Sequence, residues 1–181
     1  MRIQSDLLRT ELIAETKVII NYVNSIKDLP LTELNKRPNN DAWSTLECIE
    51  HLNRYAHFYN PELSKQIATS KHKDSGIFKS GILGNYFAES MLPKEKLNKM
   101  KTFKEMNPIH SKLNSSVIDE FLSFQTELLD LIEKSKSCDL SKTKSKISIS
   151  KFIKLRIGDT FRIVINHNIR HIEQIKRTLA A

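Results

Sequence analysis

Two histidines near the end of the chain are spaced for binding one metal ion. His167 and His171 lie four residues apart in the run N-H-N-I-R-H. A helix with 3.6 residues per turn places two such side chains about 6 Å apart along its axis and about 40° apart around it. Both imidazoles could therefore reach the same divalent ion, for which imidazole nitrogen is a common ligand.

A third histidine has a matching position in an earlier segment with helical periodicity. His51 lies at the edge of an apolar stripe formed by Cys48, Leu52, Tyr55 and Tyr59, just as the histidine pair lies at the edge of the last apolar stripe. Three imidazoles on the edges of two helices could converge at a half-open site. The spacing alone leaves a second interpretation open, because histidines four residues apart also occur by chance on helix surfaces.

The other histidines lack such a setting. His57, His72 and His110 are expected to be surface or packing residues. No separate general base is evident, because the H-E-x-x-H pattern is absent and Glu50 should point away from its neighbour His51. The aromatic residues near the first histidine are expected in the core: Trp43, Tyr55 and Tyr59.

Four segments repeat apolar residues at intervals of three, four and seven, which is the pattern of an amphipathic helix. The second of them should break at Pro61 and resume to about Lys71, because proline removes a backbone donor from the helix. The four helices are predicted at about 3–26, 44–61, 116–132 and 160–179.

Two helix starts have recognisable capping residues. Ser44 and Glu47 form the S-x-x-E capping box at the start of the second helix. Asp159, which follows Gly158, is predicted as the N-cap of the last helix. The second and last helices, which carry the candidate ligands, are therefore the best defined.

The connections differ in length. Residues 27–41 are predicted to form a loop. Residues 73–108, which contain a short apolar patch at 82–91, are predicted to form a long irregular excursion that holds one short helix. Residues 147–156 could be extended or helical, because alternation holds in only part of the segment. Four apolar stripes are all buried when the helices pack around one axis, so we predict an all-α four-helix bundle forming a single domain over 1–181.

The composition is that of an ordinary globular protein. Of the 181 residues, 39% are hydrophobic and 28% charged, which argues against a disordered or fibrous chain. The first fifteen residues lack the pattern of a secretory signal, and no run of eighteen residues is free of charge, so we expect no membrane span. Cys48 and Cys138 are then expected as two reduced thiols in a cytoplasmic protein.

The chain is basic, with a formal net charge of +8. The basic residues are densest from Lys134 to Arg156, where Phe152 is the only aromatic residue able to stack on a base. We therefore expect a solvated surface rather than a nucleic-acid-binding site, and no membrane partner.

Two motifs resemble those of DinB-like proteins. Residues 42–52 (A-W-S-T-L-E-C-I-E-H-L) are similar to the family's W-S-x-x-E-x-x-x-H-L signature, and residues 167–175 (H-N-I-R-H-I-E-Q-I) to its closing H-x-x-R-H-x-x-Q-I motif. The motifs occur in the expected order, so the resemblance covers essentially the whole chain. It implies a four-helix bundle with metal ligands at His51, His167 and His171, and a zinc or nickel ion as cofactor.

The resemblance also implies a chemistry. DinB-like proteins include transferases and isomerases that use low-molecular-weight thiols, so the expected partners are a small thiol and an electrophilic substrate. A metal-dependent hydrolase and a non-enzymatic metal-binding stress-response protein stay open as alternatives, as does a homodimer. Arg170 belongs to the closing motif and is interpreted either as an anion clamp beside the metal or as a solvated salt-bridge residue, since it lies away from the apolar stripe.

Overall fold

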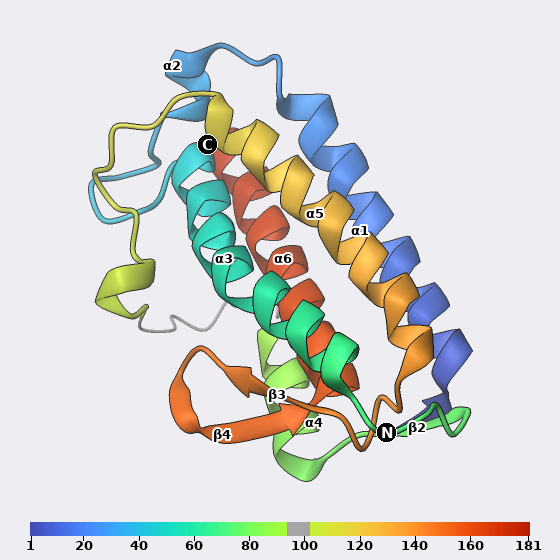
Figure 1. Ribbon diagram of the computed structural model, residues 1–181. Coiled ribbons are helices and arrows are strands. Elements are labelled where there is room, and N and C mark those ends of the chain that lie inside the picture. The colour runs from blue at the N-terminus through green and yellow to red at the C-terminus, as the bar shows by residue number, and fades with distance from the viewer. Residues whose placement is uncertain (94–101) are drawn as a thin grey trace.

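The computed structural model describes residues 1–93 and 102–181, and within these residues four long helices lie side by side in a bundle (Figure 1). α1 and α6 run upward in Figure 1 whereas α3 and α5 run downward, so the connection from α3 to α5 must return along the bundle. The predicted all-α four-helix bundle with a long excursion between its second and third main helices is confirmed. The four bounds are Ser5–Ile26 (α1), Thr45–Thr69 (α3), Ser116–Lys134 (α5) and Ile157–Leu179 (α6).

Each long helix buries one apolar stripe. α1 and α3 each contact both α5 and α6, which places the stripes around one core. Full burial of one such aliphatic side chain stabilises the fold by about 1.5–3 kcal/mol. No helix in residues 1–93 and 102–181 is long and apolar enough to cross a membrane. The stripe predicted for α1 is buried as expected: Leu8, Leu12, Ile19, Val23 and Ile26.

α3 begins where the sequence predicts but does not break at proline. The Ser44 side chain accepts a hydrogen bond from the Glu47 N–H and the Glu47 carboxylate accepts one from the Ser44 N–H, which completes the capping box. The helix then continues through Pro61 to Thr69, so the predicted break is wrong. Leu63 and Ile67, beyond the proline, are buried in the same core, and their packing offsets the backbone hydrogen bond that proline removes.

α6 begins earlier than predicted, and Asp159 is not its N-cap. The helix starts at Ile157, which places Asp159 inside the first turn, where it is completely buried. Its carboxylate accepts hydrogen bonds from the Gly81 N–H, at 2.8 Å, and from the Ser80 hydroxyl. Asp159 therefore binds the start of α4 to α6, because a buried carboxylate is stable only when its oxygens are hydrogen-bonded.

The excursion between α3 and α5 contains the predicted short helix, α4 (Ile82–Met91). It also contains β2 (Ile77–Lys79) and the 3-10 helix η1 (Lys104–Met106), while 94–101 of the predicted excursion lie outside the described residues. β2 pairs antiparallel with β1 (Arg2–Gln4), which is why α1 starts at Ser5 rather than at the predicted residue 3. The short α2 (Leu31–Leu34) lies in the predicted first loop.

The segment that the sequence left unassigned is extended. β3 (Lys144–Ile147) and β4 (Ser150–Arg156) form an antiparallel hairpin between α5 and α6, preceded by the 3-10 helix η2 (Ser135–Ser137). In β3, Ser145 and Ile147 are buried, whereas Lys144 and Lys146, which alternate with them, are exposed. The alternation matches a strand with one face on the protein. Of the described basic residues from Lys134 to Arg156, the lysines face solvent, as expected, and Arg156 is half-buried.

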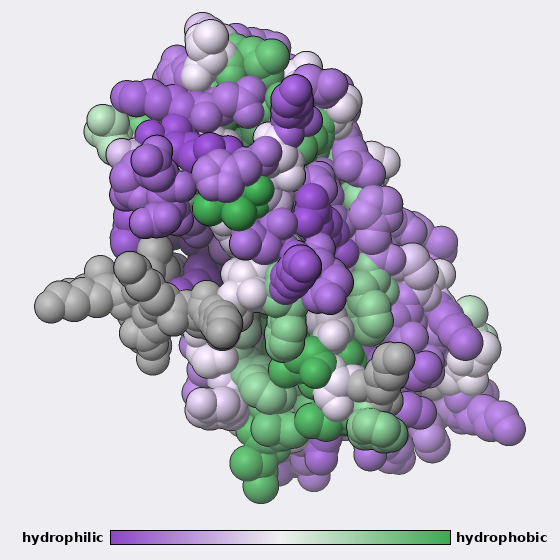
Figure 2. Space-filling view, turned by 90° about the vertical axis from the view of Figure 1, so that its left-hand side faces the viewer, coloured by the Kyte–Doolittle hydropathy of each residue, from purple (hydrophilic) through white to green (hydrophobic). Residues whose placement is uncertain are grey.

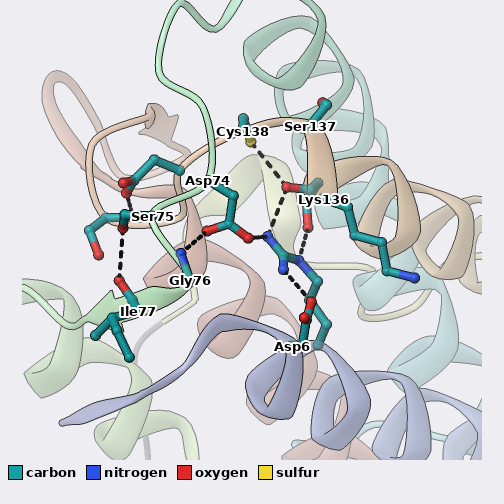
Figure 3. A network of polar contacts seen from close by, with 12 residues as sticks. Asp6, Asp74, Ser75, Gly76, Ile77, Lys136, Ser137 and Cys138 are labelled. Atoms are coloured by element: carbon teal, nitrogen blue, oxygen red, sulfur yellow. Dashed lines mark hydrogen bonds and ion pairs between the residues drawn. The ribbon is translucent and has the colours of Figure 1, made fainter.

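A buried arginine ties three parts of the chain together near the start of α1 (Figure 3). The Arg9 guanidinium is 2% exposed and donates hydrogen bonds to Asp6 and Asp74, each at 2.8 Å, and to the backbone oxygen of Ser135 at 3.0 Å. It thereby links α1 to the segment after α3 and to the end of α5. Next to it, Cys138 is buried and free, as is Cys48 in the core, so the two predicted thiols are confirmed.

Candidate metal centre

The three histidines predicted from spacing meet between α3 and α6. His51 lies in the first two turns of α3, and His167 and His171 lie at the middle of the antiparallel α6 and one turn beyond it, so the three side chains meet. The Nε2 atom of His167 lies 3.2 Å from Nε2 of His51 and 3.1 Å from Nε2 of His171. One ligand nitrogen from each ring lies within 4.8 Å of the others.

This spacing fits a divalent ion. With metal–nitrogen bonds of about 2.0–2.1 Å, adjacent ligand nitrogens are about 2.9 Å apart in an octahedral site and about 3.3–3.4 Å apart in a tetrahedral one. The two short Nε2 distances fall between these values. The three rings can therefore share one ion after small side-chain movements.

The protonation of two rings also suits a metal. The Nδ1 atom of His51 lies 2.6 Å from the backbone oxygen of Met106, and Nδ1 of His171 lies 2.9 Å from Oε1 of Gln174. Because the Met106 oxygen can only accept, His51 carries its proton on Nδ1, and the bond to Oε1 of Gln174 favours the same tautomer in His171. Both rings then present an unprotonated Nε2 to the centre.

Without a cation, the centre cannot satisfy all three nitrogens. If His51 and His171 carry their protons on Nδ1, His167 supplies a single Nε2–H donor, so only one of its two neighbours receives a full hydrogen bond. His51 and His171 are only 3% and 7% exposed, so water is poorly placed to replace the missing donor. A bound cation would satisfy every lone pair, which makes the cluster a fitting metal site.

Burial keeps the imidazoles neutral. The pKa of His51 is lowered to about 4, mainly by burial and also by the nearby Arg54 charge, although the bond to Met106 raises it. Burial also lowers the pKa of His167 and of His171 well below the ordinary value, with smaller contributions from the charge of His51 and of Arg170 on both rings. The rings are therefore unprotonated near neutral pH, as metal binding requires.

Two aromatic rings wall the centre. The Trp43 ring centroid lies 4.6 Å from that of His51 and 5.7 Å from that of His171, on which it stacks. The Tyr55 ring meets His51 edge-on at 5.0 Å and His167 at 4.8 Å. Both aromatics, which the sequence placed in the core, are half-buried and contact the candidate ligands.

The expectation for the other three histidines is confirmed, whereas the solvated position expected for Arg170 is wrong. His57, His72 and His110 are exposed and lie outside the cluster. Arg170, expected on a solvated side of α6, is instead 7% exposed, because a helical wheel treats α6 alone whereas neighbouring elements cover this side in the bundle. Burial lowers the pKa of its guanidinium. Its positive charge contributes to the low pKa of His171.

Sequence reasoning missed the partners of the ligand rings. Gln174 lies three residues after His171, a spacing that brings side chains together on one helix face, so it could have been found. Met106 lies 55 residues from His51 and contributes a backbone oxygen, for which no residue type is diagnostic. The contact between Met106 and His51 becomes apparent only in the folded structure, where the excursion between α3 and α5 returns to the start of α3.

Comparison of the sequence with known proteins and protein families assigns the chain to one family. No curated protein and no solved structure matches the chain significantly. The model of the DinB superfamily matches residues 19–175, a span that includes all four long helices in part or in full and all three clustered histidines. The chain therefore belongs to the DinB superfamily.

Proposed function

We propose that the protein is a divalent-metal-dependent enzyme, a low-molecular-weight-thiol S-transferase or isomerase, with zinc or nickel held by His51, His167 and His171. The convergence of the three Nε2 atoms, with two rings held in the tautomer that leaves Nε2 unprotonated, carries the proposal. Neutral imidazoles suit both zinc and nickel. Membership of the DinB superfamily supports the same set of ligands.

The number of ligands favours catalysis over a structural metal. Within the part of the chain that the structure describes, no cysteine or carboxylate joins the three histidines. Cys48 lies in the hydrophobic core, where burial raises the pKa of its thiol and keeps it protonated. Catalytic sites typically use three protein ligands and leave a position for water or substrate, whereas structural zinc sites are closed by four.

An ion in this centre would lower the pKa of a coordinated thiol or water toward neutrality. The protein contributes by keeping the imidazoles neutral, by orienting His51 and His171 through Met106 and Gln174, and by walling the centre with aromatic rings. In the transfer, the thiol sulfur forms a bond to the electrophilic carbon. The bond from that carbon to the leaving group breaks, the leaving group departs with the electron pair, and the thiol proton passes to solvent.

Arg170 is proposed to hold an anionic group of the thiol. Its guanidinium is the charge that acts on both His167 and His171 from the same helix, and a planar guanidinium binds carboxylates well. Replacing Arg170 with Gln should raise the Michaelis constant for an anionic thiol and leave the metal content unchanged. Equal loss of metal would assign the residue a structural role.

The test begins with metal analysis of protein purified without a histidine tag. Zinc- and nickel-loaded protein is then assayed with several small thiols and 1-chloro-2,4-dinitrobenzene, beside His167→Ala. His57→Ala, which removes an exposed histidine of the same helix α3, is the matched control. Wild type and His57→Ala should exceed His167→Ala by about a hundredfold or more, as expected when a metal-activated nucleophile is lost.

Two other outcomes would replace the proposal. Metal-dependent ester hydrolysis without thiol transfer would identify a hydrolase that uses the same centre. Stoichiometric metal without either activity, together with a fourth protein ligand, would identify a non-enzymatic metal-binding protein.

A further inference from the structure

A cavity of about 80 Å³ lies against the candidate metal centre. Residues of α3, α5 and α6 line it, together with Ile147 of the β3–β4 hairpin and Phe87 of α4, and it is partly open to solvent. His167 and Tyr55 also line it, so the cavity reaches one of the three imidazoles directly. Figure 2 shows that apolar residues gather on the lower half of this side of the molecule, where Figure 1 places the hairpin and α4.

The wall of the cavity carries no charge among the residues that the structure describes. Its surface is formed mainly by aliphatic and aromatic side chains, and its polar members are amides, hydroxyls and the imidazole of His167. Transfer of an unpaired ionised group into such surroundings costs several kcal/mol or more. A charged ligand is therefore excluded, and a hydrocarbon group is favoured.

Most polar groups of the wall already have partners. The Asn168 amide donates to Gln125 at 3.0 Å, and the Tyr59 hydroxyl lies 3.1 Å from that of Ser148. The Asn60 amide donates to the backbone oxygen of Phe124 at 3.1 Å. These bonds stay intact when an apolar group enters, and they offer little to a polar ligand that would have to break them.

The volume limits the size of the occupant. A well-studied apolar cavity of 150 Å³ in another protein stays dry and binds benzene. By this comparison the interior of the present cavity holds about three carbon atoms, so a short branched alkyl chain fits inside, and a single ring enters by one edge and extends through the open side.

We propose that this cavity binds the uncharged apolar part of the electrophilic substrate, a short alkyl or single-ring group, and presents the adjoining reactive carbon beside His167. The inference rests on the proposed function and adds the class of electrophile. Arg170 does not line the cavity, so an anionic thiol and an apolar electrophile would occupy different sides of the centre.

The test measures binding without any reaction. Toluene and benzoate share one ring and differ in charge, and each is titrated into metal-free and zinc-loaded protein while amide chemical shifts are followed. Toluene should bind saturably and shift amides of α3, α6 and the hairpin in both forms. At the cavity amides of the metal-free protein, benzoate should bind at least about tenfold more weakly, because its carboxylate would have to be desolvated.

A cavity-filling variant locates the binding. Ala56 lines the cavity from α3 and is 5% exposed, so Ala56→Leu should weaken toluene binding by about tenfold or more and leave zinc stoichiometry unchanged. Ala68→Leu adds the same side chain at an exposed position of α3 and should bind toluene like wild type. If the Leu variant does not fold, Ala56→Val fills less space and should give a smaller loss in the same direction.

The outcomes separate this inference from the proposed function. Absence of toluene binding, equal binding of benzoate, or unchanged binding by folded Ala56→Leu and Ala56→Val would each overturn the inference, even if thiol transfer is observed. Toluene binding that Ala56→Leu abolishes would support the cavity even if no thiol gives turnover, in which case only the proposed chemistry is wrong.

Discussion

Replacing Gln174 with Leu should weaken zinc binding without removing a ligand. Oε1 of Gln174 lies 2.9 Å from Nδ1 of His171, and this bond favours the tautomer whose Nε2 faces the other two imidazoles. Leu has a similar size and helix propensity, so α6 should be retained. The variant therefore removes the orienting bond while all three histidines stay in place.

The expected loss is about tenfold. Removal of a hydrogen-bond partner from a metal-ligating histidine typically costs roughly 10–100-fold in metal affinity. A net hydrogen-bond contribution of about 0.5–1.5 kcal/mol corresponds to roughly 2–13-fold. Gln174 is only half-buried, so water can partly replace its oxygen and the loss should lie near the overlap of these two ranges.

The dissociation constant of zinc is measured by competition with a chromophoric chelator at neutral pH. Gln66→Leu serves as the control, because Gln66 is a half-buried glutamine of α3 whose side chain bonds to Glu62, away from the cluster. If Gln174→Leu binds zinc within about twofold of wild type, the bond to His171 does not orient the ligand and the reasoning from tautomers fails.

Three further predictions concern stability. Burial alone would raise the pKa of the Glu47 carboxyl group. Hydrogen bonds from Arg37 and from two backbone N–H groups nevertheless hold this pKa below its ordinary 4.5. The stability that Glu47 contributes is thus present above about pH 4.5 and is lost as the pH falls through the lower pKa of the folded state. Urea unfolding at several pH values should show this loss in the wild type and a smaller loss in Glu47→Gln. Arg9→Met should lower the free energy of unfolding by about 3–5 kcal/mol because it leaves a partly buried carboxylate unpaired, whereas Asp6→Asn, at an exposed partner, should cost about 0–1 kcal/mol in the same assay. Free zinc at a hundred times its dissociation constant should raise that free energy by about 2.7 kcal/mol, and a similar rise in His171→Ala would contradict the assignment of ligands.

The helices and the ligand positions could be predicted because both depend on local periodicity. The capping box at Ser44 fixes the start of α3, and therefore the side of the helix on which His51 lies. The interval between His167 and His171 works in the same way within α6. Once two antiparallel helices bury their apolar stripes against each other, residues on the adjoining edges must meet.

The remaining features depend on contacts between distant residues. Helix propensity predicts a break at Pro61, and only the burial of Leu63 beyond it explains why α3 continues. The buried position of Arg170 results from elements that cover α6, which its own periodicity does not reveal. The hairpin over the cavity has too short an alternating pattern to be distinguished from a helix in the sequence alone.

Glu105–Asn107, in the excursion between α3 and α5, make contacts that couple the folding of this turn to metal binding. The Met106 oxygen accepts from His51, Asn107 accepts from the Trp43 indole at 3.1 Å, and Arg54 donates to the backbone oxygens of residues 105 and 107. If the ion binds more tightly when His51 is oriented by Met106, ion binding must also stabilise the folded turn at Glu105–Asn107. By thermodynamic linkage, unfolding of this turn must lower the affinity for the ion by the same factor by which the ion stabilises the turn. Zinc should therefore slow hydrogen exchange at Met106 and Asn107, and a protease cut between residues 107 and 114 should release metal while the four helices stay folded.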